Sequence, residues 1–173
     1  MRKFLLATGA VLLMCVTASA QSTDSVMVAP SEAEVATPRV EVFAGYSYLR
    51  IYGEDSNGGN VAVTANVNRW FGVTGDISAH AAVDDRGEDT TLVVAGPRFT
   101  YRRGPVTPYM HFMFGGAFGG DQTEGALVFG GGVDAKVGEH VAIRIAQVDY
   151  VATTFRSNKA RISAGIVFRF GEK

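Results

Sequence analysis

A strict alternation of apolar and polar side chains is the feature that most limits what this chain can fold into. It is clearest in RISAGIVFRF, residues 161–170, where every even position is apolar and every odd position except Val167 is polar or glycine. A side-chain period of two belongs to a β-strand with two unlike faces. After Pro38 the pattern recurs, each time closed by a turn signal. It predicts strands at roughly 39–50, 60–68, 71–82, 91–102, 108–118, 125–137, 140–152 and 159–170.

The number and length of these segments indicate how the strands assemble. Eight is an even number, each segment is close to the roughly 9 to 11 residues of a tilted transmembrane strand, and no helical period follows the N-terminus. In the seventh segment the polar parity slips between Arg144 and Gln147, which predicts a β-bulge near Ala146. Pro97 does not fit a closed sheet, because it cannot donate a ladder hydrogen bond.

The size of the apolar side chains decides which face is outside. A barrel of about eight strands has an interior that side chains just fill. The apolar face carries many phenylalanine and tyrosine rings, whereas the polar face is thinned by glycines such as Gly45, Gly96 and Gly130. The rings therefore face lipid. The sequence predicts an all-β fold, an eight-stranded antiparallel up-and-down transmembrane β-barrel, and leaves a soluble lipocalin-like carrier as a third possibility.

The N-terminus predicts export. Arg2 and Lys3 precede an apolar run, and Ala18-Ser19-Ala20 ends in small residues, which predicts a signal peptide over residues 1–20 that is cleaved after Ala20. Residues 21–38 are small, acidic and proline-punctuated, which predicts a flexible periplasmic segment before a barrel domain over 39–173. Cys15 is lost with the signal peptide, so the mature chain has no disulfide. A net charge of -1 gives no basic field for nucleic acid.

The polar face predicts a lumen with charges of both signs. Buried charges must be paired, so a static salt-bridged plug is one interpretation. A narrow gated ion pore, in which an arginine exchanges between carboxylates, is the alternative. The predicted lumen charge network consists of Glu41, Asp76, Arg98, Asp134, Lys136, Arg144, Asp149, Arg161 and Arg169.

Three polar residues of one strand invite a catalytic interpretation. Asp76, Ser78 and His80 share a face, as a hydrolase triad would require, but neighbours two apart on a strand lie roughly 7 Å from each other, beyond hydrogen-bond reach. We therefore expect no enzyme activity and no catalytic residues. His80 and His111 are expected to be lumen hydrogen-bonders, and the residue spacing predicts no metal site and no cofactor.

Aromatic residues gather near the predicted strand ends, as in the girdles at the two membrane interfaces. The interface aromatics expected here are Tyr46, Tyr48, Trp70, Tyr101 and Tyr109.

Five stretches carry a family resemblance over roughly residues 39–173: VEVFAGYSYLR, NVNRWFGVTGD, GPRFTYR, VAIRIAQVDY and RISAGIVFRF. They resemble the OmpA-like outer-membrane β-barrel superfamily, in its eight-stranded "outer membrane protein beta-barrel" branch. The resemblance implies insertion by the barrel assembly machinery, which reads a last strand ending in an aromatic residue. Phe168 and Phe170 are the residues that match this assembly signal.

The predicted loops are acidic, with Glu54, Asp55, Asp84, Asp85, Glu88, Asp89, Asp121 and Glu124. Such loops could bind the divalent cations that bridge lipopolysaccharide, or an extracellular protein, but the favoured interpretation is a solvated rim that discourages association of strand edges. The sequence thus predicts a monomer in a Gram-negative outer membrane, with both termini periplasmic. Its partners would be membrane lipids and lipopolysaccharide, and its role structural, in membrane integrity or surface interaction. The porin-like gated pore remains the alternative.

Overall fold

The computed structural model describes residues 37–51, 54–83, 89–119, 122–154 and 159–172. The predicted signal peptide and nearly all of the predicted N-terminal segment lie outside them. No helix in this part of the chain is long and apolar enough to span a membrane. The described residues form eight strands, which are β1 (Pro38–Ile51), β2 (Glu54–Asn66), β3 (Phe71–Ala82), β4 (Thr90–Thr100), β5 (Val106–Gly119), β6 (Gln122–Lys136), β7 (Val141–Thr153) and β8 (Lys159–Glu172).

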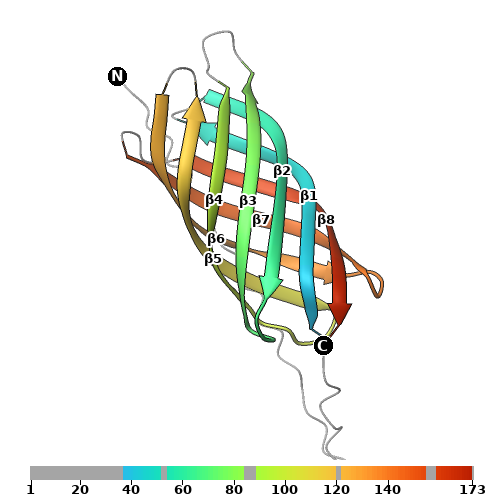
Figure 1. Cartoon of the computed structure of the whole chain (residues 1–173). Coiled ribbons are helices and arrows are strands. Elements are labelled where there is room, and N and C mark those ends of the chain that lie inside the picture. The colour runs from blue at the N-terminus through green and yellow to red at the C-terminus, as the bar shows by residue number, and fades with distance from the viewer. Residues whose placement is uncertain (1–36, 52–53, 84–88, 120–121, 155–158, 173) are drawn as a thin grey trace, which may run out of the picture. The chain divides into compact units, whose positions relative to one another are not determined.

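The strands follow one another around a closed antiparallel barrel, and β8 pairs with β1 to close it (Figure 1). The closing pair runs almost the full length of both strands, from Pro38 opposite Glu172 to Ile51 opposite Lys159. We call the rim with the turns at 67–70, 101–105 and 137–140 the terminal rim, because β1 begins and β8 ends there. The opposite rim, where the other four connections lie, is the distal rim.

The second strand begins earlier than the sequence predicts, at Glu54 instead of residue 60. Its first residues are polar or glycine, a composition that predicts a loop. In the structure they continue the ladder with β1, as Arg50 pairs with Asp55. On the outer surface the Tyr46 hydroxyl donates to Asn57. Cross-strand pairing therefore keeps these polar residues in the strand beyond the apolar part of the wall.

The two faces of the barrel have the predicted orientation. Phe170 is 52% exposed on the outside, whereas Arg161 on the same strand is 0% exposed inside. The outward apolar side chains occur on every strand and include Val61, Val73, Ile77, Phe99, Phe112, Phe114, Leu127, Phe129, Ile143, Ile162 and Ile166. The rings of the last strand are outside and its arginines inside, so the fold class predicted from side-chain size is confirmed.

The predicted bulge is present in β7. Arg144 pairs with Gly165 of β8 and Gln147 pairs with Ser163, so Ile145 and Ala146 together face a single residue. Ile145 and Ala146 both point outward, and Arg144 and Gln147 are both buried in the lumen. The extra residue thus keeps one polar face along the whole strand.

Pro97 lies in β4 between two neighbours and yet leaves the sheet in register. It pairs with Val73 of β3 on one side. On the other side the ladder with β5 stops after Ala95 and resumes at Arg98 opposite His111. The missing N–H therefore interrupts one ladder locally, and the barrel closes around the interruption.

Candidate functional site: the ion-paired lumen

The centre of the lumen is organised around Arg161 of β8. Its Nη1 donates to Asp76 Oδ1 across the barrel at 2.7 Å, and its Nε donates to Asp149 Oδ2 of the neighbouring strand at 2.9 Å. Its Nη1 also donates to the Ser78 hydroxyl at 2.9 Å. Asn60 Nδ2 donates a further hydrogen bond to Asp76 Oδ2 at 2.9 Å. One guanidinium therefore holds two carboxylates on opposite walls, which is the pairing that buried charges require.

A second group of charges lies nearer the terminal rim. Asp134 accepts from Arg144 Nε at 2.8 Å and from Arg98 Nη2 at 2.9 Å. Arg98 also approaches Glu41 Oε2 at 3.4 Å. Arg102 Nη1 donates to Glu41 Oε1 at 3.0 Å from the turn that follows β4. Burial lowers the pKa of the Arg102 guanidinium from its ordinary value, and the Glu41 carboxylate opposes that shift.

Gln147 connects the two groups of charges. Its Oε1 accepts from the Tyr109 hydroxyl at 2.7 Å and from Arg144 Nη1 at 2.8 Å. Its Nε2 donates to Asp149 Oδ2 at 2.7 Å. The Tyr109 ring lies under Arg98, with 3.8 Å between the guanidinium carbon and the ring centroid. The network, which we call the ion network, is therefore continuous from Glu41 to Asp76.

The distal part of the lumen is apolar on the side of β4 to β7. The residues there form one buried cluster, which we call the apolar plug: Leu92, Val94, Met113, Ala117, Ala126, Val128 and Val151. Leu92, Met113, Val128 and Val151 are all 0% exposed. Side chains thus fill the lumen both by ion pairing and by hydrophobic packing.

Two glycines of β6 make room for the ion network. A Cβ on Gly130 would lie 2.2 Å from Asp149 Oδ1, and one on Gly132 would lie 2.6 Å from the Tyr109 hydroxyl oxygen. Both distances are too short for real atoms, so neither position accepts a side chain without displacing a network member.

Both predicted lumen histidines are buried, and they have different partners. His111 Nε2 lies 2.7 Å from Asp149 Oδ1. His80 Nε2 lies 2.9 Å from the hydroxyl of Ser47, which also accepts from Ser163 at 3.0 Å. His80 therefore contacts a different serine from the one two residues before it. Ser78 and Asp76 contact Arg161 instead, so the three residues of that strand do not assemble into a triad.

Two predicted residues differ from the expectation in different ways. Lys136 is exposed at the end of β6, where it lines the mouth of the lumen beside Glu41 and Arg169, and within the described part of the chain no ion pair joins it to a carboxylate. Tyr109 is 7% exposed and belongs to the lumen, not to an interface girdle. Its parity is the reason, because it shares a face with His111. Arg169 lies at the edge of the network, with its Nε 4.0 Å from Glu41 Oε1.

The remaining predicted interface aromatics point outward. Tyr46 and the half-buried Tyr48 lie toward the distal rim, and Trp70 and Tyr101 lie at the terminal rim. Phe168 and Phe170, the predicted assembly signal, are also on the outer face near the terminal rim. Their placement is that of two aromatic belts, and the role of the last pair in assembly stays a prediction.

Sequence reasoning missed Arg102, Gln147 and Tyr109 as lumen residues of the network. Parity places Gln147 on the polar face, but it carries no charge that would mark it as a member of the network. Arg102 belongs to a turn, where parity gives no direction. Of the predicted acidic loop residues, Asp55 and Asp89 are exposed, and Asp84, Asp85, Glu88 and Asp121 lie outside the described residues. Across the described ranges, no group of three or more metal-ligating side chains occurs.

A closed antiparallel tube with an apolar outside and an ion-paired inside has the fold of a transmembrane β-barrel. No protein-family model and no curated protein matches this chain by sequence. Solved structures do match. Neisserial surface protein A is 19% identical with a TM-score of 0.56, over 76% of this chain and 96% of that one. Ail, the attachment invasion locus protein of Yersinia pestis, solved with the heparin analogue sucrose octasulfate, is 17% identical with a TM-score of 0.54, over 78% and 99%.

A designed protein shares the same architecture. A de novo transmembrane β-barrel is 12% identical with a TM-score of 0.50, over 77% of this chain and 97% of that one. At these identities the likeness shows the fold. That fold is the small eight-stranded barrel found in bacterial outer-membrane proteins.

Proposed function

We propose that this chain is an integral outer-membrane protein with a structural or surface-interaction role, and that its lumen is a static plug without enzyme activity. The observation that carries the proposal is the contrast between the two faces of one wall. Phenylalanine, isoleucine and valine cover the outside, and ion pairs at 2.7 to 2.9 Å lie inside, as at Asp76, Asp149 and Asp134. A bilayer favours this arrangement and water does not, so the soluble carrier is disfavoured.

The lumen contacts favour a statically filled lumen over the gated pore. Arg161 is held at once by Asp76, Asp149 and Ser78, and an exchange between partners would leave a buried carboxylate without its cation. The apolar plug fills the lumen with packed hydrocarbon along β4 to β7 on the distal side.

The finer assignment follows the family resemblance. We place the chain in the OmpA-like branch, as a monomer inserted by the barrel assembly machinery, with Phe168 and Phe170 as the signal on the last strand. The terminal rim then faces the periplasm, and the acidic distal rim faces lipopolysaccharide or an extracellular ligand. Acidic residues such as Asp55 and Asp89 disfavour a polyanion like the heparin analogue bound to Ail. A cationic ligand or divalent ions fit better.

Two measurements on the purified barrel test the proposal. In the first, an unheated sample in detergent should migrate differently from a boiled one on an SDS gel, because a closed barrel resists unfolding. Unchanged mobility would contradict a membrane barrel. In the second, planar bilayers containing the barrel should show no discrete openings. Stepwise conductance of constant size would contradict the plug and favour the pore.

A further inference from the structure

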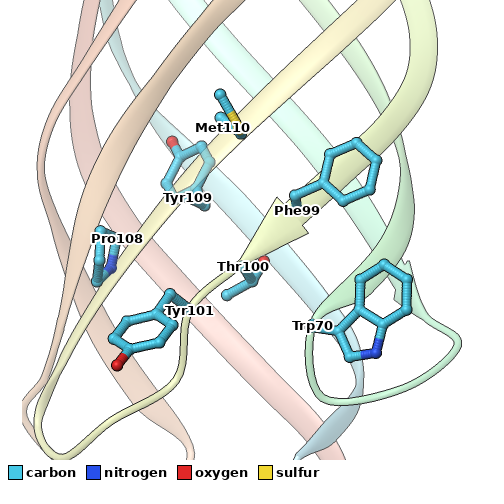
Figure 2. A pocket seen from close by; sticks show the side chains of 7 residues that line it. All are labelled: Trp70, Phe99, Thr100, Tyr101, Pro108, Tyr109 and Met110. Atoms are coloured by element: carbon cyan, nitrogen blue, oxygen red, sulfur yellow. The ribbon is translucent and has the colours of Figure 1, made fainter.

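The outer wall has an apolar groove at the terminal rim, over the last residues of β4 and the first residues of β5. Its volume is about 330 Å³, which lies within the range of about 300 to 1,000 Å³ found for small-molecule sites. In Figure 2, Trp70 and Phe99 lie on one side of Thr100. Tyr101 and Pro108 lie on its other side. The groove is lined by Trp70, Phe99, Thr100, Tyr101, Pro108, Tyr109 and Met110.

One side of the groove is held firmly by the preceding turn. Asn68 Oδ1 accepts the backbone N–H groups of Trp70 at 3.0 Å and Phe71 at 2.8 Å. Trp70 O accepts from the backbone N–H of Thr100 at 2.8 Å. The Trp70 ring stacks on Phe99 with 6.2 Å between centroids and 12° between planes. These contacts fix the indole, so this wall of the groove is formed before any ligand binds.

The floor and the other side offer almost no polar groups. The Tyr101 backbone N–H donates to Pro108 O at 2.9 Å, and Pro108 has no N–H of its own. Tyr109 turns its hydroxyl into the lumen, toward Gln147. An occupant of this groove therefore meets rings and hydrocarbon, which suits a chain of methylene groups.

The end of the groove at the rim is basic. The Arg103 guanidinium lies over the Tyr101 ring, 5.5 Å from its centroid. Arg69, next to Trp70 in the turn, is exposed. None of the seven lining residues is acidic. An apolar slot with arginines at its mouth complements a molecule with an apolar tail and an anionic head, because guanidinium groups pair with phosphate oxygens.

We propose that the groove binds one acyl chain of an anionic phospholipid, with the headgroup phosphate beside Arg103 and Arg69. The proposal rests on the proposed function, which places this rim at a membrane interface, where aromatic belts and arginines meet headgroups. A protein partner fits less well. A stable protein contact buries about 800 Å² on each side, which a groove bounded by seven residues does not supply.

Native mass spectrometry of the detergent-folded barrel tests this site. The barrel is mixed with equal amounts of phosphatidylglycerol and phosphatidylcholine of identical acyl chains. We expect phosphatidylglycerol to be retained preferentially, by about fivefold for each arginine near the headgroup. The Arg69→Gln/Arg103→Gln variant should retain the two lipids about equally. Arg50→Gln, which removes an exposed arginine at the distal rim, is the matched control and should keep the preference.

A second variant tests the apolar slot independently of charge. Phe99→Ala removes part of one wall, and it should reduce retention of both lipids without changing their ratio. Equal retention by the unmodified barrel would overturn the site, and so would a preference that survives the double arginine variant. A dimer peak that replaces the lipid adduct would assign the groove to a second copy. A barrel that fails the heated-gel test contradicts the proposed function, and the site with it. One that passes and retains both lipids equally contradicts the site alone.

Discussion

The ion network and the apolar plug fill the same lumen by opposite means. In the ion network, charged groups around Arg161 and Asp134 satisfy one another through short hydrogen bonds. In the apolar plug, Leu92 and Met113 are equally buried and pack in one cluster of apolar side chains. The comparison teaches that a narrow barrel does not require a polar interior. It requires an interior that is filled and has its charges paired.

The largest expected effect comes from the centre of the ion network. Arg161→Met would leave Asp76 and Asp149 buried without their shared cation. We expect the free energy of unfolding to fall by about 3 to 5 kcal/mol, the cost of breaking a buried pair. Urea unfolding in lipid vesicles, followed by tryptophan fluorescence, measures it. An effect below that of an exposed control such as Arg50→Met would mean that the network contributes nothing.

The apolar plug should respond by a different route. Met113→Ala removes a fully buried side chain and leaves a cavity, so we expect a loss of about 2 to 5 kcal/mol in the same unfolding measurement. Unlike Arg161→Met, this variant should show no dependence of the loss on pH, because neither Met113 nor its cross-strand partner Val128 titrates. A pH-dependent loss would show that the two regions are coupled.

Breaking the connection between the two groups of charges should lower the free energy of unfolding by less than Arg161→Met or Met113→Ala. Gln147→Leu removes the acceptor for Tyr109 and Arg144 and the donor to Asp149. We expect a loss of about 1 to 3 kcal/mol, the usual cost of leaving buried polar groups unpaired. A double variant with Arg161→Met measures the coupling. Strict additivity would show two independent clusters instead of one network.

The smallest effect should come from an ion pair outside the lumen. Arg50 and Asp55 lie 3.9 Å apart on the outer surface near the distal rim, where both side chains are about half exposed or more. Arg50→Gln should change the free energy of unfolding by less than about 1 kcal/mol, because water screens such pairs. A loss as large as that of Gln147→Leu would remove the distinction between lumen and surface charges.

Most of the fold could be predicted from alternation and side-chain size. The eight strands, the outward rings and the bulge near Ala146 all follow from parity, because a wall between lipid and a filled lumen allows only one pattern on each face. The start of β2 could not be predicted, since its polar residues are held by pairing with β1 and not by burial.

The candidate site could be predicted only in part. Charge and parity together locate Arg161, Asp76, Asp134 and Asp149. They do not locate the apolar plug, because an inward leucine looks the same in sequence as an outward one whose parity has slipped. They also misplace Tyr109, because a tyrosine suits both an interface and a lumen. Parity gives the correct face for Lys136, but its position at the end of β6 leaves it exposed at the mouth of the lumen.

The extra residue in β7 makes that strand respond differently to a deletion at the bulge and to an insertion beyond it. Deleting Ala146 would leave Arg144, Ile145 and Gln147 facing in, out and in along an uninterrupted ladder, so every later side chain would keep its surface. Inserting one residue after Gln147 would instead turn Asp149 toward hydrocarbon and Tyr150 toward the lumen beside β6. A one-residue deletion at the bulge should therefore still permit insertion into the membrane, whereas a one-residue insertion after it should not.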